Sequence, residues 1–126
     1  MKNIKFRAWD NQAKHYWNLD IRNMIFLYNK LKNTNYHVLR LSALEVFNNT
    51  NRFDIEQFIG LHDKNGKDIY EGDIIKYVDL AKRTNYLQVG YSETNACFFI
   101  GGIHIETASG DGEVVGNIHE NPELLD

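Results

Sequence analysis

The sequence predicts a mainly β domain of the α+β class, in which an antiparallel sheet forms a barrel-like structure with one or two short helices. Two observations and one general physical argument predict this fold. Apolar residues recur with a period close to two over most of the chain, as in half-buried strands. The apolar segments are short and closely spaced, and Gly, Asn and Asp residues separate them. Finally, a sheet that closes on itself hides the strand edges that would otherwise aggregate.

Length and composition are those of one soluble domain over residues 1–126. The chain weighs 14.7 kDa and is 43% hydrophobic and 25% charged, which excludes wholesale disorder. Its net charge of -3 excludes a strongly basic nucleic-acid coat and a polybasic membrane binder. The single cysteine excludes an internal disulfide. Because the sequence contains neither a membrane-length apolar run nor a signal-peptide pattern, we expect a cytoplasmic protein without membrane contact.

The N-terminal residues predict a β-hairpin. Ile4, Phe6 and Ala8 alternate with polar or amphipathic neighbours, as expected of a half-buried strand. The turn residues Asp10–Gln12 follow, and then Tyr16 and Trp17 fit a partner strand.

The next segment predicts two strands and the clearest helix of the sequence. Met24–Tyr28 is a short apolar run that fits a buried strand or a helix, and its length and aromatic content favour the strand. Tyr36–Leu41 alternates as a strand does. Ser42–Glu45 has the pattern of a capping box. In this motif the serine hydroxyl accepts the backbone N–H of the glutamate, and the glutamate carboxylate accepts the backbone N–H of the serine. Asn48 and Asn49 then end a helix of about two turns.

A second hairpin is predicted between Ile55 and Tyr77. Two apolar runs flank Asp63–Lys67, where the Asn65-Gly66 pair favours a tight type I′ turn. Glu71–Asp73 then reverses the chain before the next strand. The remaining predicted elements are strands at Ile74–Val78, Tyr86–Tyr91, Ala96–Ile100, Ile103–Ile105 and Glu113–Ile118, a turn at Ser109–Gly112, and a short helix beginning at Asn121-Pro122.

The sequence contains no recognisable catalytic, metal or cofactor motif. Cys97 lies among apolar residues of a predicted strand, where a thiol is expected to be buried and inert. His104 and Glu106 share a face of a predicted strand but lack a third metal ligand. Glu71 and Asp73 could act as acid and base in a cleft, although an acidic turn that starts a strand is the simpler interpretation.

One segment combines basic and aromatic residues in the manner of a nucleic-acid-binding surface. It contains Lys76, Tyr77, Lys82, Arg83 and Tyr86. Aromatic side chains on a sheet can stack on bases while lysine and arginine hold phosphates. The acidic balance of the whole chain opposes this interpretation, as does the absence of a helix-turn-helix or phosphate-binding loop.

Three parts of the chain contain motifs that occur in the same order in one protein family. The residues are Lys5–Asp10, then Gln57–Leu61, Asp63–Lys67 and Ile69–Ile75, and finally Val114–Ile118 and Glu120–Leu125. These motifs resemble the YopX family of bacteriophage and prophage proteins of Gram-positive bacteria. Ile59 stands where that family often has threonine, and His119 where it often has tyrosine. The stretches between the motifs match the family only loosely.

The resemblance implies a large antiparallel β-barrel with helical elements that mediate self-association, and a phage or prophage origin. It brings no reaction, since no activity is established for the family. Within the motifs, the turn or close-approach residues are expected to be Gly60, Asn65, Gly66, Gly72 and Gly116. A shared binding surface, if the family has one, would use the polar and amphipathic motif residues Arg7, Trp9, Asp10, Tyr70, Glu71 and Asp73.

These observations favour a phage accessory protein that binds a host or phage macromolecule without catalysis. The first alternative is a nucleic-acid-binding β-barrel. The second is an unrecognised enzyme in which Glu71, Asp73 or His104 lines a cleft.

Overall fold

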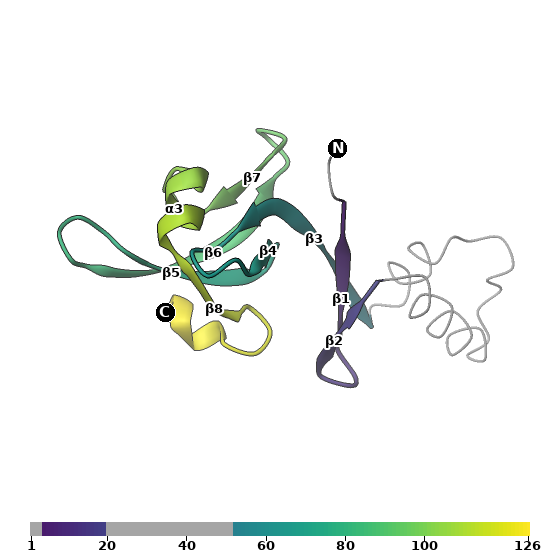
Figure 1. Ribbon diagram of the computed structural model, residues 1–126. Coiled ribbons are helices and arrows are strands. Elements are labelled where there is room, and N and C mark those ends of the chain that lie inside the picture. The colour runs from purple at the N-terminus through teal and green to yellow at the C-terminus, as the bar shows by residue number, and fades with distance from the viewer. Residues whose placement is uncertain (1–3, 20–51) are drawn as a thin grey trace, which may run out of the picture. The chain divides into compact units, whose positions relative to one another are not determined.

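The computed structural model of the protein describes residues 4–19 and 52–126 (Figure 1). These residues form eight strands, one α-helix and one 3-10 helix. The strands predicted at Met24–Tyr28 and Tyr36–Leu41 and the helix predicted at Ser42 lie outside the described residues. No helix of the described ranges has both the length and the apolar character needed to cross a membrane.

The chain divides into two compact units, which share one strand. The N-terminal unit comprises Lys5–Glu56, and the C-terminal unit comprises Gln57–Asp126 with Met1–Ile4. Strand β3, Phe53–His62, begins in the former and ends in the latter. The expectation of one domain over the whole chain therefore stays a prediction, while the mainly β, antiparallel fold class is confirmed.

The N-terminal unit contains the predicted hairpin. Strand β1, Phe6–Asp10, pairs antiparallel with β2, His15–Asn18, so that Trp9 lies opposite Tyr16. Burial does not alternate as expected, because Ala8, Trp9 and Asp10 are all buried. Strand β3 lies on the other side of β1.

The hairpin predicted around Asn65-Gly66 is confirmed, but its turn is of a different type. Strand β3 pairs antiparallel with β4, Asp68–Tyr70. A type I′ turn needs positive φ at both central residues, and in this turn only Gly66 has it, at 83°. The Gly66 N–H donates to the Asp63 carbonyl at 2.9 Å, and the Asp63 N–H donates to the Lys67 carbonyl at 2.9 Å. The connection is therefore a type I turn followed by a glycine bulge.

A four-stranded antiparallel sheet with the order β7-β6-β5-β8 forms the body of the C-terminal unit. Its strands are β5 (Asp73–Val78), β6 (Thr84–Ser92), β7 (Cys97–Ile100) and β8 (Glu113–Asn117). The sheet curls like half of a barrel (Figure 1). One face carries Ile75, Val89 and Ile100, which pack with Ile69 of β4 and with Ala108 in the core of this unit.

Helix α3, Ile105–Asp111, replaces two elements that the sequence predicted incorrectly. The strand expected at Ile103–Ile105 is reduced to one bridge between Ile103 and Ile100, and the turn expected at Ser109–Gly112 is helical up to Asp111. The helix packs on β5 and β7 and buries Ala108 in the core. This burial outweighs the poor helix propensity of its threonine and glycine, because packing stabilises short helices more than propensity does.

The glycines predicted to serve turns or close approaches occupy such positions. Gly60 lies at a register irregularity of β3 with φ of 90°, and Gly72 lies in the turn before β5 with φ of 85°. Gly116 has another role: a Cβ there would lie 2.5 Å from Oδ1 of Asn121. That oxygen accepts the Asn117 N–H at 3.2 Å and does not cap the C-terminal 3-10 helix, Pro122–Leu125.

Candidate functional site

Glu71 and Asp73, the predicted acid–base pair, bind backbone amides of the C-terminal unit. Oε1 of Glu71 accepts the Gln57 N–H at 2.9 Å, and the Glu71 N–H donates back to the Gln57 carbonyl at 2.9 Å. Asp73 is buried, and its Oδ2 accepts the Tyr70 N–H at 2.8 Å. Both carboxylates thus stabilise the turn before β5, as the simpler interpretation of the sequence expected.

Asp10 organises the hydrogen bonds of the N-terminal unit. Its buried carboxylate accepts two bonds from the Arg52 guanidinium, at 3.0 and 2.9 Å, and one from the Trp17 indole at 3.1 Å. The N–H groups of Gln12 and Ala13 each donate to it at 3.0 Å. Burial alone would raise the pKa of this carboxyl, but the Arg52 side chain and the other donors hold the pKa well below its usual value.

Arg7 and Trp9 are also tied into the N-terminal unit. Nε of Arg7 lies 2.9 Å from Oε1 of Glu56, and its guanidinium lies 4.0 Å from the centre of the Tyr16 ring. Trp9 is buried and packs edge-on against the same ring, with centroids 5.0 Å apart. The Tyr16 hydroxyl donates to the same Glu56 oxygen at 3.0 Å.

The predicted binding surface therefore consists of two groups, one in each unit. Arg7, Trp9 and Asp10 share strand β1, whereas Tyr70, Glu71 and Asp73 share the turn between β4 and β5. Trp9, Asp10 and Asp73 are buried and would need a local rearrangement to contact a partner. A common surface of these six residues stays a prediction.

The histidine and cysteine candidates occupy positions that differ from the predictions. His104 precedes helix α3 and Glu106 lies in its first turn, so they do not share the face of a strand. Over residues 4–19 and 52–126, no three His, Cys, Asp or Glu side chains gather as metal ligands would. Cys97 is exposed at the start of β7, not buried as expected, because it lies on the opposite face of the strand from the core residue Ile100.

Several exposed apolar side chains of the C-terminal unit lie on the β5–β6 hairpin, which projects from the sheet at the left of Figure 1. Leu80, in its connecting loop, is fully exposed. Val78 is 50% exposed and Tyr86 is 41% exposed. The basic and aromatic residues of this segment were recognised from sequence, but Val78 and Leu80 were not. An apolar residue of a strand such as Val78 is normally assigned to a core, and a single apolar residue in a loop such as Leu80 gives no signal of its own.

Val78 and Tyr86 lie on the face of the sheet opposite the core, where Ile74, nearer the start of β5, is itself buried. In the strand register Lys76 pairs with Tyr86, Val78 with Thr84, and Phe99 with Gly90. Since side chains alternate between the two faces, the residues of this face are separated by even intervals along each strand. We call it the outer face, and its exposed residues are Lys76, Val78, Thr84, Tyr86, Gln88 and Phe99.

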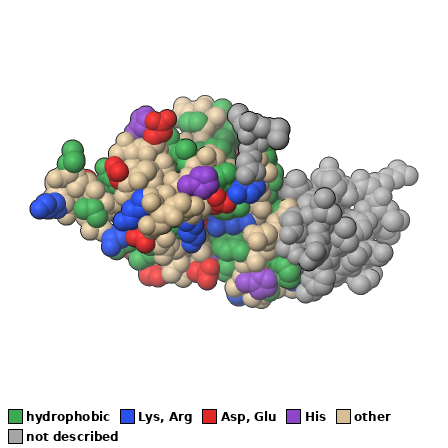
Figure 2. All heavy atoms as spheres, in the orientation of Figure 1, with side chains coloured by type: hydrophobic (Ala, Val, Ile, Leu, Met, Phe, Trp, Pro, Cys, Tyr) green, Lys and Arg blue, Asp and Glu red, His purple; other side chains and the backbone are tan. Residues whose placement is uncertain are grey.

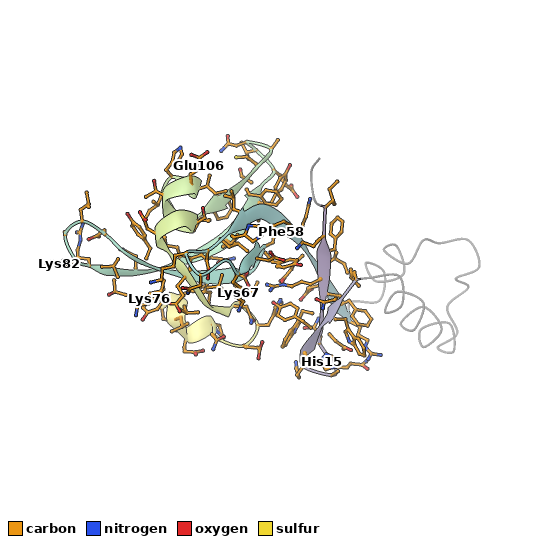
Figure 3. All side chains as sticks on the ribbon, viewed as in Figure 1. His15, Phe58, Lys67, Lys76, Lys82 and Glu106 are labelled. Carbon is orange, nitrogen blue, oxygen red and sulfur yellow. The ribbon has the colours of Figure 1, made fainter. Side chains whose placement is uncertain are left out.

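The loop at the end of the hairpin is held in a fixed conformation. Asp79 and Arg83 are joined by two backbone-mediated bonds, since the Asp79 N–H donates to the Arg83 carbonyl at 3.0 Å and the Arg83 N–H donates to Oδ1 of Asp79 at 2.9 Å. The Arg83 guanidinium adds a bond of 3.0 Å to Oδ2. The Arg83 N–H is the main reason that the pKa of Asp79 lies below its ordinary value. Lys82 lies at the outer end of this hairpin and Lys76 nearer the sheet (Figure 3).

Cationic and hydrophobic side chains appear together on the projecting hairpin in Figure 2. Between residues 76 and 86 the chain has three cations, Lys76, Lys82 and Arg83, and one carboxylate, Asp79. The segment is thus positively charged in a chain whose net charge is -3. Chemically, such an arrangement can form apolar contacts and bind anionic groups on the same surface.

The fold has a counterpart among solved structures. Protein EF1440 from Enterococcus faecalis aligns over 100% of both chains with a TM-score of 0.63 and 24% sequence identity. At this identity the likeness shows the fold alone. No curated protein is significantly similar to the chain in sequence.

The family resemblance noted in the motifs is confirmed over nearly the whole chain. The family described as YopX protein matches residues 5–126. All three groups of motif residues fall within this range, including the turns at Gly66 and Gly72 and the close approach at Gly116. The chain therefore belongs to the YopX family.

Proposed function

We propose that this protein is a phage or prophage accessory protein that binds a host or phage macromolecule in the host cytoplasm, through the outer face and Leu80. The observation that carries the proposal is the projecting β5–β6 hairpin, whose loop is ordered while its apolar side chains are exposed. Val78, Leu80 and Tyr86 all lie within this hairpin.

Exposed apolar side chains on an ordered hairpin gain little from folding, but they can contribute to binding. Burying one leucine or valine side chain against a partner contributes about 1.5–3 kcal/mol. Because the Asp79–Arg83 bonds already fix the loop, a partner would not have to pay for ordering it. The carboxylates that an enzyme would need, Glu71 and Asp73, instead have backbone partners in the turn before β5.

The test is retention of macromolecules by the tagged protein from a Gram-positive host lysate, with and without nuclease. The variant Val78→Ser/Leu80→Ser removes the apolar contacts of the hairpin. The control Ile4→Ser alters another exposed apolar residue, which is 65% exposed and lies outside the hairpin. We expect wild type and control to retain the same discrete macromolecule and the double variant to lose it.

Retention of identical material by all three proteins, or of none, would overturn the proposal. Self-association, which the resemblance implies, belongs to the proposal as a separate property, and light scattering on the same samples measures it. If Val78→Ser/Leu80→Ser has the same molar mass in solution as wild type, self-association does not use these two residues, and the outer face is free to bind the host or phage macromolecule.

A further inference from the structure

We infer that the outer face binds a single-stranded nucleic acid, with bases stacked on Tyr86 and Phe99 and phosphates held by Lys76 and Lys82. This inference rests on the proposed function, since it identifies the partner of the same surface. The residues alone suggested nucleic-acid binding in general, whereas the strand register specifies which face of the sheet would bind and favours single strands.

The first support is the position of the two exposed rings. Tyr86 lies on β6, and Phe99 of β7 lies opposite Gly90, four residues further along β6. Both side chains therefore occupy the same face, about 13 Å apart along the strand direction. Tyr86 is 41% exposed and Phe99 is 38% exposed, so each presents part of its ring to solvent. Aromatic rings on a sheet face are a general platform for unpaired bases.

Gly90 holds the Phe99 ring against the sheet. A Cβ at Gly90 would lie 2.4 Å from Cζ of Phe99, so the ring covers the backbone where any larger residue would displace it. The ring thus packs on the Gly90 backbone while Phe99 stays 38% exposed. The glycine, which weakens a strand by itself, has a packing role in this position.

The second support is the placement of cations beside these rings. Lys76 is exposed directly opposite Tyr86 in the register, and Lys82 is exposed at the end of the hairpin. Arg83 forms an ion pair with Asp79. The only carboxylate of residues 76–86 therefore neutralises one of the three cations. The two lysines therefore carry the net positive charge of residues 76–86, and they flank the stacking surface as phosphate contacts would need to. On its other side Lys76 lies opposite Glu113 of β8, whose carboxylate is 4.0 Å from the Lys64 ammonium.

Single strands are favoured over duplexes by the shape of the surface. A stacking ring needs an unpaired base, whereas a duplex presents only its base edges in the grooves. Gln88, also exposed on the outer face, adds an amide that can bond to a base edge or a sugar between the two rings.

The test is fluorescence anisotropy of a labelled oligothymidine of about 20 nucleotides, at salt concentrations from about 50 to 300 mM. The variant Lys76→Gln/Lys82→Gln is compared with Lys14→Gln/Lys67→Gln, which changes the net charge equally. Lys14 is a matched control for Lys82, since both have positive φ, 58° and 62°. We expect at least about tenfold weaker binding for the first pair only, and a salt slope reduced by about 1.4 for its two lost phosphate contacts.

Two further measurements test the stacking. Tyr86→Ser should weaken binding about tenfold with little change in circular dichroism, because a base–ring contact is lost. Ultraviolet crosslinking of the wild-type complex, followed by peptide mapping, should place the crosslinks on β6 and β7, and this readout does not depend on a variant that folds.

Absence of binding at the lowest salt, equal losses in both lysine pairs, or crosslinks elsewhere would overturn the inference. Equal or tighter binding of a duplex of the same sequence would overturn the single-strand assignment. If the oligonucleotide does not bind while Val78→Ser/Leu80→Ser still loses a protein from the lysate, the nucleic-acid inference fails and the proposed binding function stands.

Discussion

The two hairpins of the C-terminal unit have the same turn but use it differently. In each, an aspartate begins the turn and accepts the N–H four residues later: Lys67 donates to Asp63 and Arg83 donates to Asp79, both at 2.9 Å. The fourth residue has positive φ in both turns, 83° at Gly66 and 62° at Lys82. The β3–β4 hairpin packs into the core through Ile69, whereas the β5–β6 hairpin projects into solvent.

The difference lies in what the second carboxylate oxygen contacts. Oδ2 of Asp63 accepts the N–H of Val114 at 2.9 Å and so connects the turn to β8, 51 residues further along the chain. Oδ2 of Asp79 instead bonds to the Arg83 guanidinium within its own turn. The same local chemistry thus serves the fold in one hairpin, while in the other it orders a loop whose apolar residue, Leu80, remains exposed.

The largest expected difference between the hairpins follows from removal of each aspartate. Asp63→Ala leaves three backbone N–H groups without their acceptor, those of Asn65, Lys67 and Val114. We expect the free energy of unfolding to fall by about 2–4 kcal/mol, since each unsatisfied buried donor costs about 1–3 kcal/mol and water relieves the more exposed ones. Asp79→Ala should lower it by less than about 1 kcal/mol.

Urea denaturation of both variants and wild type measures this difference. Equal losses would show that Asp63 contributes only to its own turn and that its bond to Val114 adds nothing. The comparison between the hairpins would then be wrong.

Acid titration gives a smaller effect from the same residue. Burial raises the pKa of Asp63, but the N–H groups of Val114, Lys67 and Asn65 outweigh it and hold the pKa below its ordinary value. A carboxyl with a lowered folded-state pKa stabilises the protein above its unfolded-state pKa, and this contribution is lost as pH falls through the folded-state value. Stability should therefore decline below about pH 4.

The variant Asp63→Asn isolates this contribution, because it keeps one acceptor oxygen and cannot titrate. Its free energy of unfolding, followed by urea denaturation between about pH 7 and 3, should decline less than that of wild type. Asp79→Asn is the matched control from the exposed turn, and it should follow the wild-type curve closely at high salt. Parallel curves for Asp63→Asn and wild type would contradict the assignment.

The sequence predicted the position of the first of these two turns and missed the second. The Asn65-Gly66 pair identified the first turn, whereas the second turn contains no glycine or proline between Asp79 and Arg83 and was not recognised. Its left-handed residue is Lys82, a type that sequence rules do not associate with positive φ. The type of the first turn was also predicted wrongly, because Asn65 does not adopt the positive φ that a type I′ turn needs.

The outer face could not be assigned from sequence for a related reason. Strands β5 and β6 carry apolar or aromatic residues on both faces, such as Tyr77 and Val78, so their alternation does not tell which face is covered. The choice depends on long-range packing of α3 and β4 onto Ile75. Helix α3 itself was predicted as strand and turn, since its stability comes from that same packing.

The smallest predicted effect concerns the left-handed residue of each turn. Gly66→Ala should lower the free energy of unfolding by about 1 kcal/mol, because a Cβ strains this backbone conformation even though space is open around it. Lys82→Gly removes such strain but adds freedom to the unfolded chain, so the two contributions nearly cancel and the change should be under about 0.5 kcal/mol.

The second variant also separates geometry from charge on the hairpin. Lys82→Gly should keep the turn, with Asp79 still bonded to the Arg83 N–H, and lose one ammonium at its outer end. Stability measured by urea denaturation should then match wild type, while oligothymidine affinity should fall by a factor of a few and the salt slope by about 0.7. Weaker binding together with a large loss of stability would mean that Lys82 acts through the turn, and an unchanged affinity would remove it from the phosphate contacts.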